Sequence, residues 1–455
     1  MVKAYKILFF LILLAFENSA QIMVFTPESE KFLKEVQSFL GVYNKADAKE
    51  FIKEFEPIWM GGTITPDQKA QVYEASNAIT QKKLKAYPEF KNYMVSVMNF
   101  AVNGKSNSDF IAWHETFHKV LKNRDRKKIT RFIETCSNLF KDNTLYLSTS
   151  TKWQSTLSDY KFHFDKEPYI VFDKMNLKCY SKNDSSIIHN TKGIFYPLSN
   201  KWFGDGGELT WIRANLPSDK VYADLSNYRL SLKNAGFNAD SVDFHSRFFE
   251  KPIKGKLSEK ILTNLGANKV KYPRFESYDK RLVIKNVFKD IDYDGGFTIQ
   301  GANLMGSGTI DNLAKLIFRY NDEDFLIAEA INFTINEEEI SSNRSKIKFY
   351  LENDSVTHPG LIFKYVNKTG KVTLIRGDRG IAASPYYNSY HKLDMFFEAL
   401  YWKVGDSQME FAPLFGSTDI SAHFDSHNYF DRNIYDQLTG MGTNPLVQIK
   451  YFAQQ

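Results

Sequence analysis

Cysteine is scarce in this chain of 455 residues, with only Cys136 and Cys179 present. A fold that depends on a network of disulfides is therefore excluded, and we predict two buried thiols that form no bridge and bind no metal. An excess of charge of one sign is also missing, because 59 basic residues stand against 53 acidic ones and leave a formal net charge of +6. This small excess builds no nucleic-acid-binding surface, so we expect no nucleic-acid partner.

Familiar catalytic motifs are also missing. The chain has no Walker loop for phosphates, no G-x-S-x-G nucleophile turn and no paired cysteines of a zinc knuckle. Hydrophobic residues nevertheless make up 43% of the chain and aromatic residues 15%, which excludes a disordered protein. The composition thus indicates a large folded protein, and no motif in it identifies a reaction.

The N-terminus carries a pattern typical of a secretory signal peptide. Lys3 and Lys6 precede an unbroken apolar run over 7–16, and Ala20 is a small residue at the expected cleavage site. We therefore predict a signal peptide over 1–20 and a protein that is secreted, periplasmic or at the cell surface. No later apolar run reaches the length of about 20 residues that a bilayer requires, so no transmembrane segment is expected after the signal peptide.

Residues 21–143 are predicted to form an all-helical domain. Apolar residues recur there every three to four positions, which is the period of an amphipathic helix. Two pairs, Thr26-Pro27 and Thr65-Pro66, are typical of the first residues of helices. Short connections between the helical segments favour a bundle in which neighbours run antiparallel.

From residue 144 to 388 the pattern changes to that of short strands. Apolar residues stand in short runs that are separated by turn clusters, such as 204–207 and 377–380. Little helix separates these runs, so we predict a β-rich domain, with a β-solenoid favoured and stacked β-sandwiches as the alternative. The predicted fold class is accordingly α+β and multidomain.

The last segment, 389–455, is predicted to be mixed α/β. Apolar residues share helical spacing over 391–401, so we expect a helix there, strands near 409–424 and helical pieces at 434–438 and 446–452. The apolar face at the C-terminus has no visible partner in the sequence. We therefore expect the chain to be part of a longer protein.

Three segments carry a resemblance to a known group of proteins. They are 195–211, 293–308, which opens with Tyr-Asp-Gly-Gly-Phe, and 389–394, which reads Ser-Tyr-His-Lys-Leu-Asp. These segments resemble very large, exported, uncharacterised proteins of Bacteroidota. The resemblance implies a longer parent protein and a Gram-negative surface or periplasmic setting, and it implies no catalytic residues.

The motif His-Glu-x-x-His occurs at His114, Glu115 and His118 inside a predicted helix. Residues four apart share a helix face, so both imidazoles could bind one zinc ion while Glu115 acts as the general base. Glu134 is the natural third ligand if the last two helices form a hairpin. However, His114 falls within an apolar stripe, so we favour a buried histidine without zinc, and the zinc site stays the alternative.

A second candidate metal site is acidic. Asp290, Asp292 and Asp294 alternate before two glycines, as at the start of a calcium-binding loop. Position 12 of such a loop should be a glutamate but is Gly301, which excludes an EF-hand. We favour a solvated turn, with a looser calcium site as the alternative.

These observations favour a non-enzymatic exported protein of unknown ligand that acts in cell-surface structure or binds cell-surface proteins or glycans, with no cofactor. One alternative is a zinc metallopeptidase that uses the His-Glu-x-x-His helix. A second alternative is a β-helix enzyme acting on polysaccharide. That enzyme would need carboxylates and basic residues gathered along one face of its strands, an arrangement that the sequence does not reveal.

Overall fold

The computed structural model describes residues 23–157, 159–261, 270–414, 422–427, 432–439 and 445–453. The chain divides into two compact units. Unit 1 comprises Met1–His245 and Lys256–Pro273, and unit 2 comprises Ser246–Gly255 and Arg274–Gln455. The predicted signal peptide, 1–20, lies outside the described residues.

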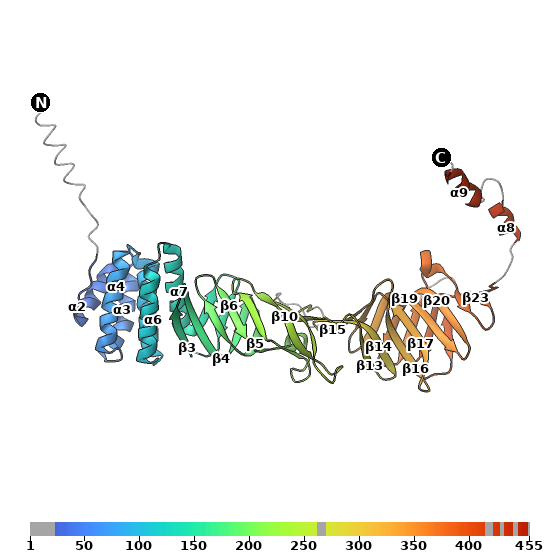
Figure 1. Ribbon diagram of the computed structural model, residues 1–455, viewed down its shortest axis with the longest axis horizontal. Helices are drawn as coiled ribbons and strands as arrows, with labels where there is room; N and C mark the ends of the chain where they lie inside the picture. The colour runs from blue at the N-terminus through green and yellow to red at the C-terminus, as the bar shows by residue number, and fades with distance from the viewer. Residues whose placement is uncertain are drawn as a thin grey trace, which may run out of the picture. The chain divides into compact units, whose positions relative to one another are not determined.

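Helices form the N-terminal part of unit 1, as predicted, and are drawn in blue in Figure 1. Each α-helix buries an apolar stripe, which in the first of them contains Phe32, Val36 and Leu40. The helices are α2 (Ser29–Gly41), α3 (Lys45–Met60), α4 (Pro66–Gln81), the π-helical turn η1 (Ala86–Phe90), α5 (Lys91–Val102), α6 (Asn107–Leu121) and α7 (Arg126–Asp142).

The two Thr-Pro pairs behave differently. Thr65 caps α4 as predicted, because its side chain accepts a hydrogen bond from the backbone of Gln68 and the Gln68 side chain bonds back to Thr65. The prediction of a cap at Thr26 is wrong, since α2 begins only at Ser29. Thr26 instead donates its backbone N–H and its hydroxyl to the carboxylate of Glu35, each at 2.7 Å. Thr26 therefore bonds a side chain within α2 and does not cap the helix.

Strands follow the helices directly. Asn143 ends α7 in a left-handed conformation, with φ of 58°, and β1 begins at the next residue. The strands up to the end of β11 are β1 (Thr144–Leu147), β2 (Lys152–Ser155), β3 (Tyr160–Phe164), β4 (Pro168–Ser181), β5 (Asp184–Tyr196), β6 (Lys201–Asp205), β7 (Glu208–Thr210), β8 (Tyr222–Asp224), β9 (Asn227–Ser231), β10 (Gly236–His245) and β11 (Ile253–Lys260). A short 3₁₀ turn, η2 (Ile212–Ala214), follows β7.

Unit 2 continues with strands almost to its end, in yellow to orange in Figure 1. They are β12 (Arg274–Ser277), β13 (Leu282–Phe288), β14 (Ile291–Gln300), β15 (Asn303–Ser307), β16 (Ala314–Tyr320), β17 (Glu323–Ala330), β18 (Asn332–Ile335), β19 (Glu339–Leu351), β20 (Asp354–Val366), β21 (Lys371–Ile375), β22 (Tyr386–Asn388), β23 (Leu393–Phe396), β24 (Ala399–Lys403), β25 (Met409–Ala412) and β26 (His423–Ser426). The last helices are α8 (Arg432–Thr439) and α9 (Pro445–Ala453), near the predicted helical pieces.

The strand pairs of the described residues are antiparallel. The long strands β4 and β5 pair with each other, and each also pairs with two shorter strands. β4 pairs with β2 and β3, and β5 pairs with β6 and β7. The α+β, multidomain class is confirmed, whereas the β-solenoid is not shown.

The helix predicted over 391–401 is wrong, because this segment forms strands β23 and β24. Leu400 pairs with Leu374 of β21, and its neighbours Ala399 and Trp402 are also buried. The helical spacing of the apolar residues was real, but pairing with a strand 26 positions earlier (Leu374 to Leu400) decided the backbone conformation.

The two units repeat one strand arrangement. The hairpin β4–β5 with its neighbour β6 recurs as β19–β20 with β21, and the counterparts differ in number by 170: Tyr196 pairs with Lys201, and Val366 pairs with Lys371. The irregular step in the hairpin recurs too, since Met175 pairs with Thr191 and Ser345 pairs with Leu361. Matching registers on both sides of a bulge indicate an internal duplication.

The duplication also leaves a trace in the sequence at the tip of each long hairpin. The pattern Lys-x-Tyr-x-x-Asn-Asp-Ser occurs at 178–185 and again at 348–355. In both copies the lysine ammonium lies over the tyrosine ring, 4.5 Å from the ring centre in unit 1 and 4.4 Å in unit 2. This repeat is short and the residues around it differ between the two copies, so the pattern alone does not stand out in the sequence.

Candidate functional site

The His-Glu-x-x-His motif lies on α6 as predicted, with His114 buried at 1% exposure. His114 Nδ1 lies 3.0 Å from the carbonyl oxygen of Phe110, and Nε2 lies 3.0 Å from the hydroxyl of Tyr93. The rings of Phe110 and Trp113 pack against the imidazole at 4.1 and 4.4 Å. Burial lowers the pKa of His114 to about 3, so the imidazole is neutral.

The other residues of the alternative zinc site are less buried than His114. His118 is half-buried, with Nε2 4.0 Å from a carboxylate oxygen of Glu74. Glu115 and Glu134 are exposed. Within the described ranges, no three His, Cys, Asp or Glu side chains are arranged to hold a metal ion.

The acidic run at Asp290, Asp292 and Asp294 belongs to the hairpin β13–β14. Asp290 takes a left-handed conformation in the turn, with φ of 61°. Asp292 is buried and accepts bonds from Lys285 Nζ at 2.7 Å and from Arg319 Nη1 at 2.5 Å. Burial opposes its ionisation, but these cationic partners outweigh burial and lower the pKa of Asp292. Protein cations thus occupy the place where the alternative prediction put calcium.

Asp294 is paired in the same way, because Arg281 Nη2 lies 2.9 Å from its carboxylate. The two cysteines are free and buried, as predicted. Burial raises the pKa of the Cys179 thiol to about 12, so this thiol is protonated and unreactive at neutral pH.

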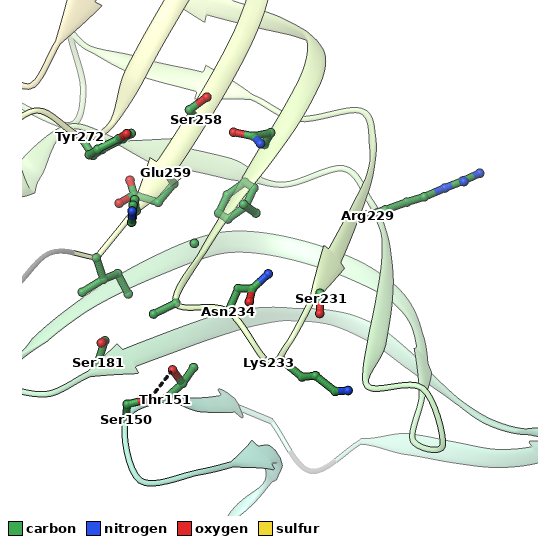
Figure 2. Close-up of a pocket in the computed structure, with 16 residues that line it drawn as sticks. Ser150, Thr151, Ser181, Arg229, Ser231, Lys233, Asn234, Ser258, Glu259 and Tyr272 are labelled. Carbon is green, nitrogen blue, oxygen red and sulfur yellow. Dashed lines mark hydrogen bonds between the residues drawn. The ribbon is translucent and has the colours of Figure 1, made fainter.

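A pocket with a volume of about 840 Å³ lies in unit 1. Its lining comes from the turn after β1, the end of β4, the β9–β10 connection and the end of β11 (Figure 2). Hydroxyl and amide side chains dominate this lining: Ser150, Thr151, Ser181, Ser231, Asn234, Asn238 and Ser258. Two aromatic residues, Phe237 and Tyr272, also line it.

Glu259 is the carboxylate of this pocket and is 3% exposed. Its Oε1 accepts a bond from Arg213 Nη1, and Arg213 also bonds Asp184 through Nη2. Oε2 is buried and has no hydrogen-bond partner among the described residues. Oε2 has less than 1 Å² of accessible surface, so a ligand in the pocket does not reach it, and the missing hydrogen bond is a cost to the fold of unit 1.

The protonation of Glu259 is finely balanced. Burial raises the pKa of Glu259 to about 7, although the Arg213 guanidinium and the backbone N–H of Lys260 act in the opposite direction. The nearby Asp184 carboxylate adds to the rise. Glu259 is thus both a hydrogen-bond donor and an acceptor near neutral pH.

The basic residues of the lining point elsewhere. The guanidinium of Arg229 lies over the ring of Phe203, 5.2 Å from its centre, and Figure 2 shows Arg229 extending away from the other lining side chains. Lys233 and Lys260 are exposed. The chemistry of the pocket is therefore that of hydroxyl, amide and aromatic groups around one buried carboxyl group.

Sequence reasoning missed this site, although one signal was present. In β11, Leu257, Glu259 and Ile261 alternate with exposed or half-buried residues, which places the glutamate in an inward position between two apolar residues. An acidic residue at an inward strand position needs a buried partner. The partner, Arg213, is 46 residues away and could not be named from the sequence.

Comparison of the chain with models of protein families, with curated proteins and with solved structures found no match. The resemblance to exported Bacteroidota proteins therefore stays a prediction. In the described residues, no helix combines the length and the apolar character needed to cross a membrane.

Proposed function

We propose that this protein is an exported, non-enzymatic binding protein that recognises glycans through the pocket over Glu259. The observation that carries the proposal is a pocket of about 840 Å³ lined by hydroxyl and amide side chains. Sugar hydroxyls both donate to and accept from hydroxyl and amide groups, so they match this lining.

The aromatic residues support the same ligand class. Phe237 and Tyr272 offer apolar ring surface in an otherwise polar pocket, and the apolar faces of sugar rings pack on such surfaces. Ligand sites generally combine apolar walls with a few placed polar groups. The signal peptide predicted over 1–20 would bring the pocket into contact with extracellular or cell-wall glycans.

A polysaccharide-cleaving enzyme is the second candidate, and one observation weighs against it at this pocket. Glycoside hydrolysis uses two carboxyl groups on opposite sides of the bond that is cleaved. Glu259 is the only carboxylate among the residues that the structure places in this lining. Asp184 bonds the same guanidinium as Glu259 and does not line the pocket.

Calorimetry with a panel of soluble oligosaccharides tests the proposal. A Tyr272→Ala variant should bind the recognised sugar about two- to tenfold more weakly, because an aromatic contact contributes about 0.5–1.5 kcal/mol. Tyr146→Ala is the matched control, since Tyr146 is a half-buried tyrosine of unit 1 outside the pocket. Equal affinities of the two variants, or no binding of any sugar by the unaltered protein, would contradict the proposal.

A further inference from the structure

Strands β25 and β26 of unit 2 correspond in sheet order to β10 of unit 1. In unit 1, β7 pairs with β8, β8 pairs with β10, and β10 also contacts β9. In unit 2, β22 pairs with β23, β23 pairs with β26, and β24 pairs with β25. Among the strand pairs of the described residues, β25 and β26 have one partner each, so they form an outer edge of the sheet of unit 2.

In unit 1 the corresponding edge is covered by β11. The backbone N–H of Ile261 donates to the carbonyl oxygen of Ala235 at 2.9 Å, just beyond the ends of the two strands. Lys256 Nζ lies 3.8 Å from a carboxylate oxygen of Asp240. Rising numbers in β11 thus meet falling numbers in β10, so the two strands run antiparallel. Under this cover, Phe244 of β10 is fully buried.

The outer edge of unit 2 ends two rows of buried residues with exposed aromatic side chains. Buried Met395 pairs with Phe424, which is 50% exposed, and buried Leu400 pairs with Phe411, which is 44% exposed. The row of unit 1 that crosses β7, β8 and β10 ends instead at the buried Phe244. Native proteins generally cover or charge the edges of sheets, because an open apolar edge promotes aggregation.

The charges of the two edges also agree. β10 carries Asp240 and Asp243, while β25 and β26 carry Glu410 and Asp425, and these strands contain no lysine or arginine. The strand that covers β10 is basic, since β11 reads Ile-Lys-Gly-Lys-Leu-Ser-Glu-Lys over 253–260. The outer edge of unit 2 therefore has the charge that suits a strand of the same kind.

We propose that the outer edge of unit 2 binds an extended strand of another protein in which lysines alternate with apolar residues. Such a strand adds to the sheet through main-chain hydrogen bonds, and its alternate side chains give specificity. Neighbouring residues of a strand face opposite sides, so the apolar residues would cover Phe411 and Phe424 while the lysines would face Glu410 and Asp425. Asp425 already lies 2.8 Å from His423 Nε2, which leaves Glu410 as the carboxylate to test.

A second copy of this chain suits the edge less well. Its own outer edge carries the same two carboxylates, and like charges repel across paired strands. Its basic strand β11 already packs along β10. The edge lies in unit 2 and the pocket over Glu259 lies in unit 1, so this proposal is independent of glycan binding.

A labelled peptide with the sequence of residues 252–261 is the probe, because this segment covers the corresponding edge in unit 1. In fluorescence anisotropy we expect the full chain to bind it, and to bind a peptide with its lysines replaced by glutamate at least about tenfold more weakly. Hydrogen exchange should slow in 409–412 and 423–426 when the peptide is bound, since the added strand engages the edge amides.

Variants of the edge locate the binding. Glu410→Lys should weaken binding about two- to fivefold, because it replaces an exposed ion pair with a like-charge contact. Glu323→Lys is the matched control, since Glu323 is an exposed glutamate at the start of β17, and it should leave binding unchanged. Phe424→Thr keeps a residue that favours strands but removes the apolar contact, and should weaken binding at least as much as Glu410→Lys. Trp402 fluorescence during unfolding checks that each variant is folded.

Three results would overturn the proposal: no binding of the 252–261 peptide, equal binding of the glutamate peptide, or slowed exchange only outside 409–426. Sedimentation equilibrium tests the other occupant. A dimer of the full chain that Phe424→Thr converts to a monomer would assign the edge to a second copy and would also overturn the proposal.

Discussion

The long hairpins of the two units have the same strand pairing, but small side chains in one stand where large ones stand in the other. In unit 1 a row across three strands reads Gly193, Gly204 and Tyr228, and in unit 2 the corresponding row reads Phe363, Leu374 and Leu400. A Cβ on Gly204 would lie 2.1 Å from the Tyr228 ring, so the tyrosine fills the space that Gly204 leaves open, and the Trp202 ring fills the space beside Gly193. The two hairpins thus share their strand pairing but not the side chains that pack on it.

The same comparison isolates the candidate site. Asp184 and Asp354 occupy equivalent positions, each the first residue of the second long strand. Asp184 belongs to the triad with Arg213 and Glu259, whereas Asp354 accepts a hydrogen bond of 2.7 Å from the hydroxyl of Ser389. The equivalent aspartates therefore bond an arginine in an ionic cluster in unit 1 and a neutral serine hydroxyl in unit 2.

Arg213→Met should give the largest effect on this comparison, a loss of about 3–5 kcal/mol in the unfolding free energy of unit 1 at about pH 8. The reason is that Glu259 would stay buried without a cation. Denaturant unfolding followed by tryptophan fluorescence measures the loss. Of the six tryptophans, Trp402 lies in unit 2, so a Trp402→Phe background confines the signal to unit 1.

A double variant provides the control for this prediction. Arg213→Met combined with Glu259→Gln leaves no ionised glutamate to compensate and should recover much of the lost stability. Equal stability of the single and double variants would show that the guanidinium acts through packing and not through charge.

The pH dependence of stability is the next largest effect. Between about pH 4.5 and about pH 7 the folded protein holds a proton on Glu259 that the unfolded chain has released, because the folded pKa is about 7 and the ordinary value is 4.5. The unfolding free energy therefore falls as the pH rises through this window, by at most about 1.4 kcal/mol per pH unit from this group. Glu259→Gln should remove this component, and an unchanged slope would contradict the assignment.

Gly204→Ala tests whether the absence of a side chain at Gly204 makes room for the Tyr228 ring. The new Cβ would clash with the Tyr228 ring, whose hydroxyl is held 2.6 Å from Thr191 Oγ1, so we expect a loss of about 1–3 kcal/mol. Adding Tyr228→Leu rebuilds part of the unit 2 row and should cost less than the sum of the two single changes. Additive losses in denaturant unfolding would contradict the compensation.

Ser389→Ala in unit 2 should have the smallest effect, a loss of about 0.5–1.5 kcal/mol, because the Ser389 hydroxyl donates to Asp354 and accepts from the backbone N–H of Ser355 but balances no buried charge. Trp402 fluorescence reports on this unit. A loss of unfolding free energy as large as that of Arg213→Met would contradict the difference inferred between the contacts of Asp184 and Asp354.

Much of the local structure was predictable from the sequence. The helical period of the N-terminal region, the cap at Thr65 and the change to strands near Thr144 are local properties, since each depends on neighbours within one or two turns. The burial of His114 followed from its place in an apolar helical stripe. The helix expected over 391–401 failed because its spacing was ambiguous and a distant strand decided the outcome.

The sequence by itself determined the N-terminal helices, the change to strands near Thr144 and the inward strand positions, including Glu259 between Leu257 and Ile261. Only the tertiary structure decided which side chains contact Glu259. Arg213, on η2, lies 29 residues from Asp184 and 46 from Glu259, on β11, and only the folded chain brings these three together. Period and propensity act over a few residues, whereas charge pairing and cavity shape depend on contacts between strands far apart in the chain.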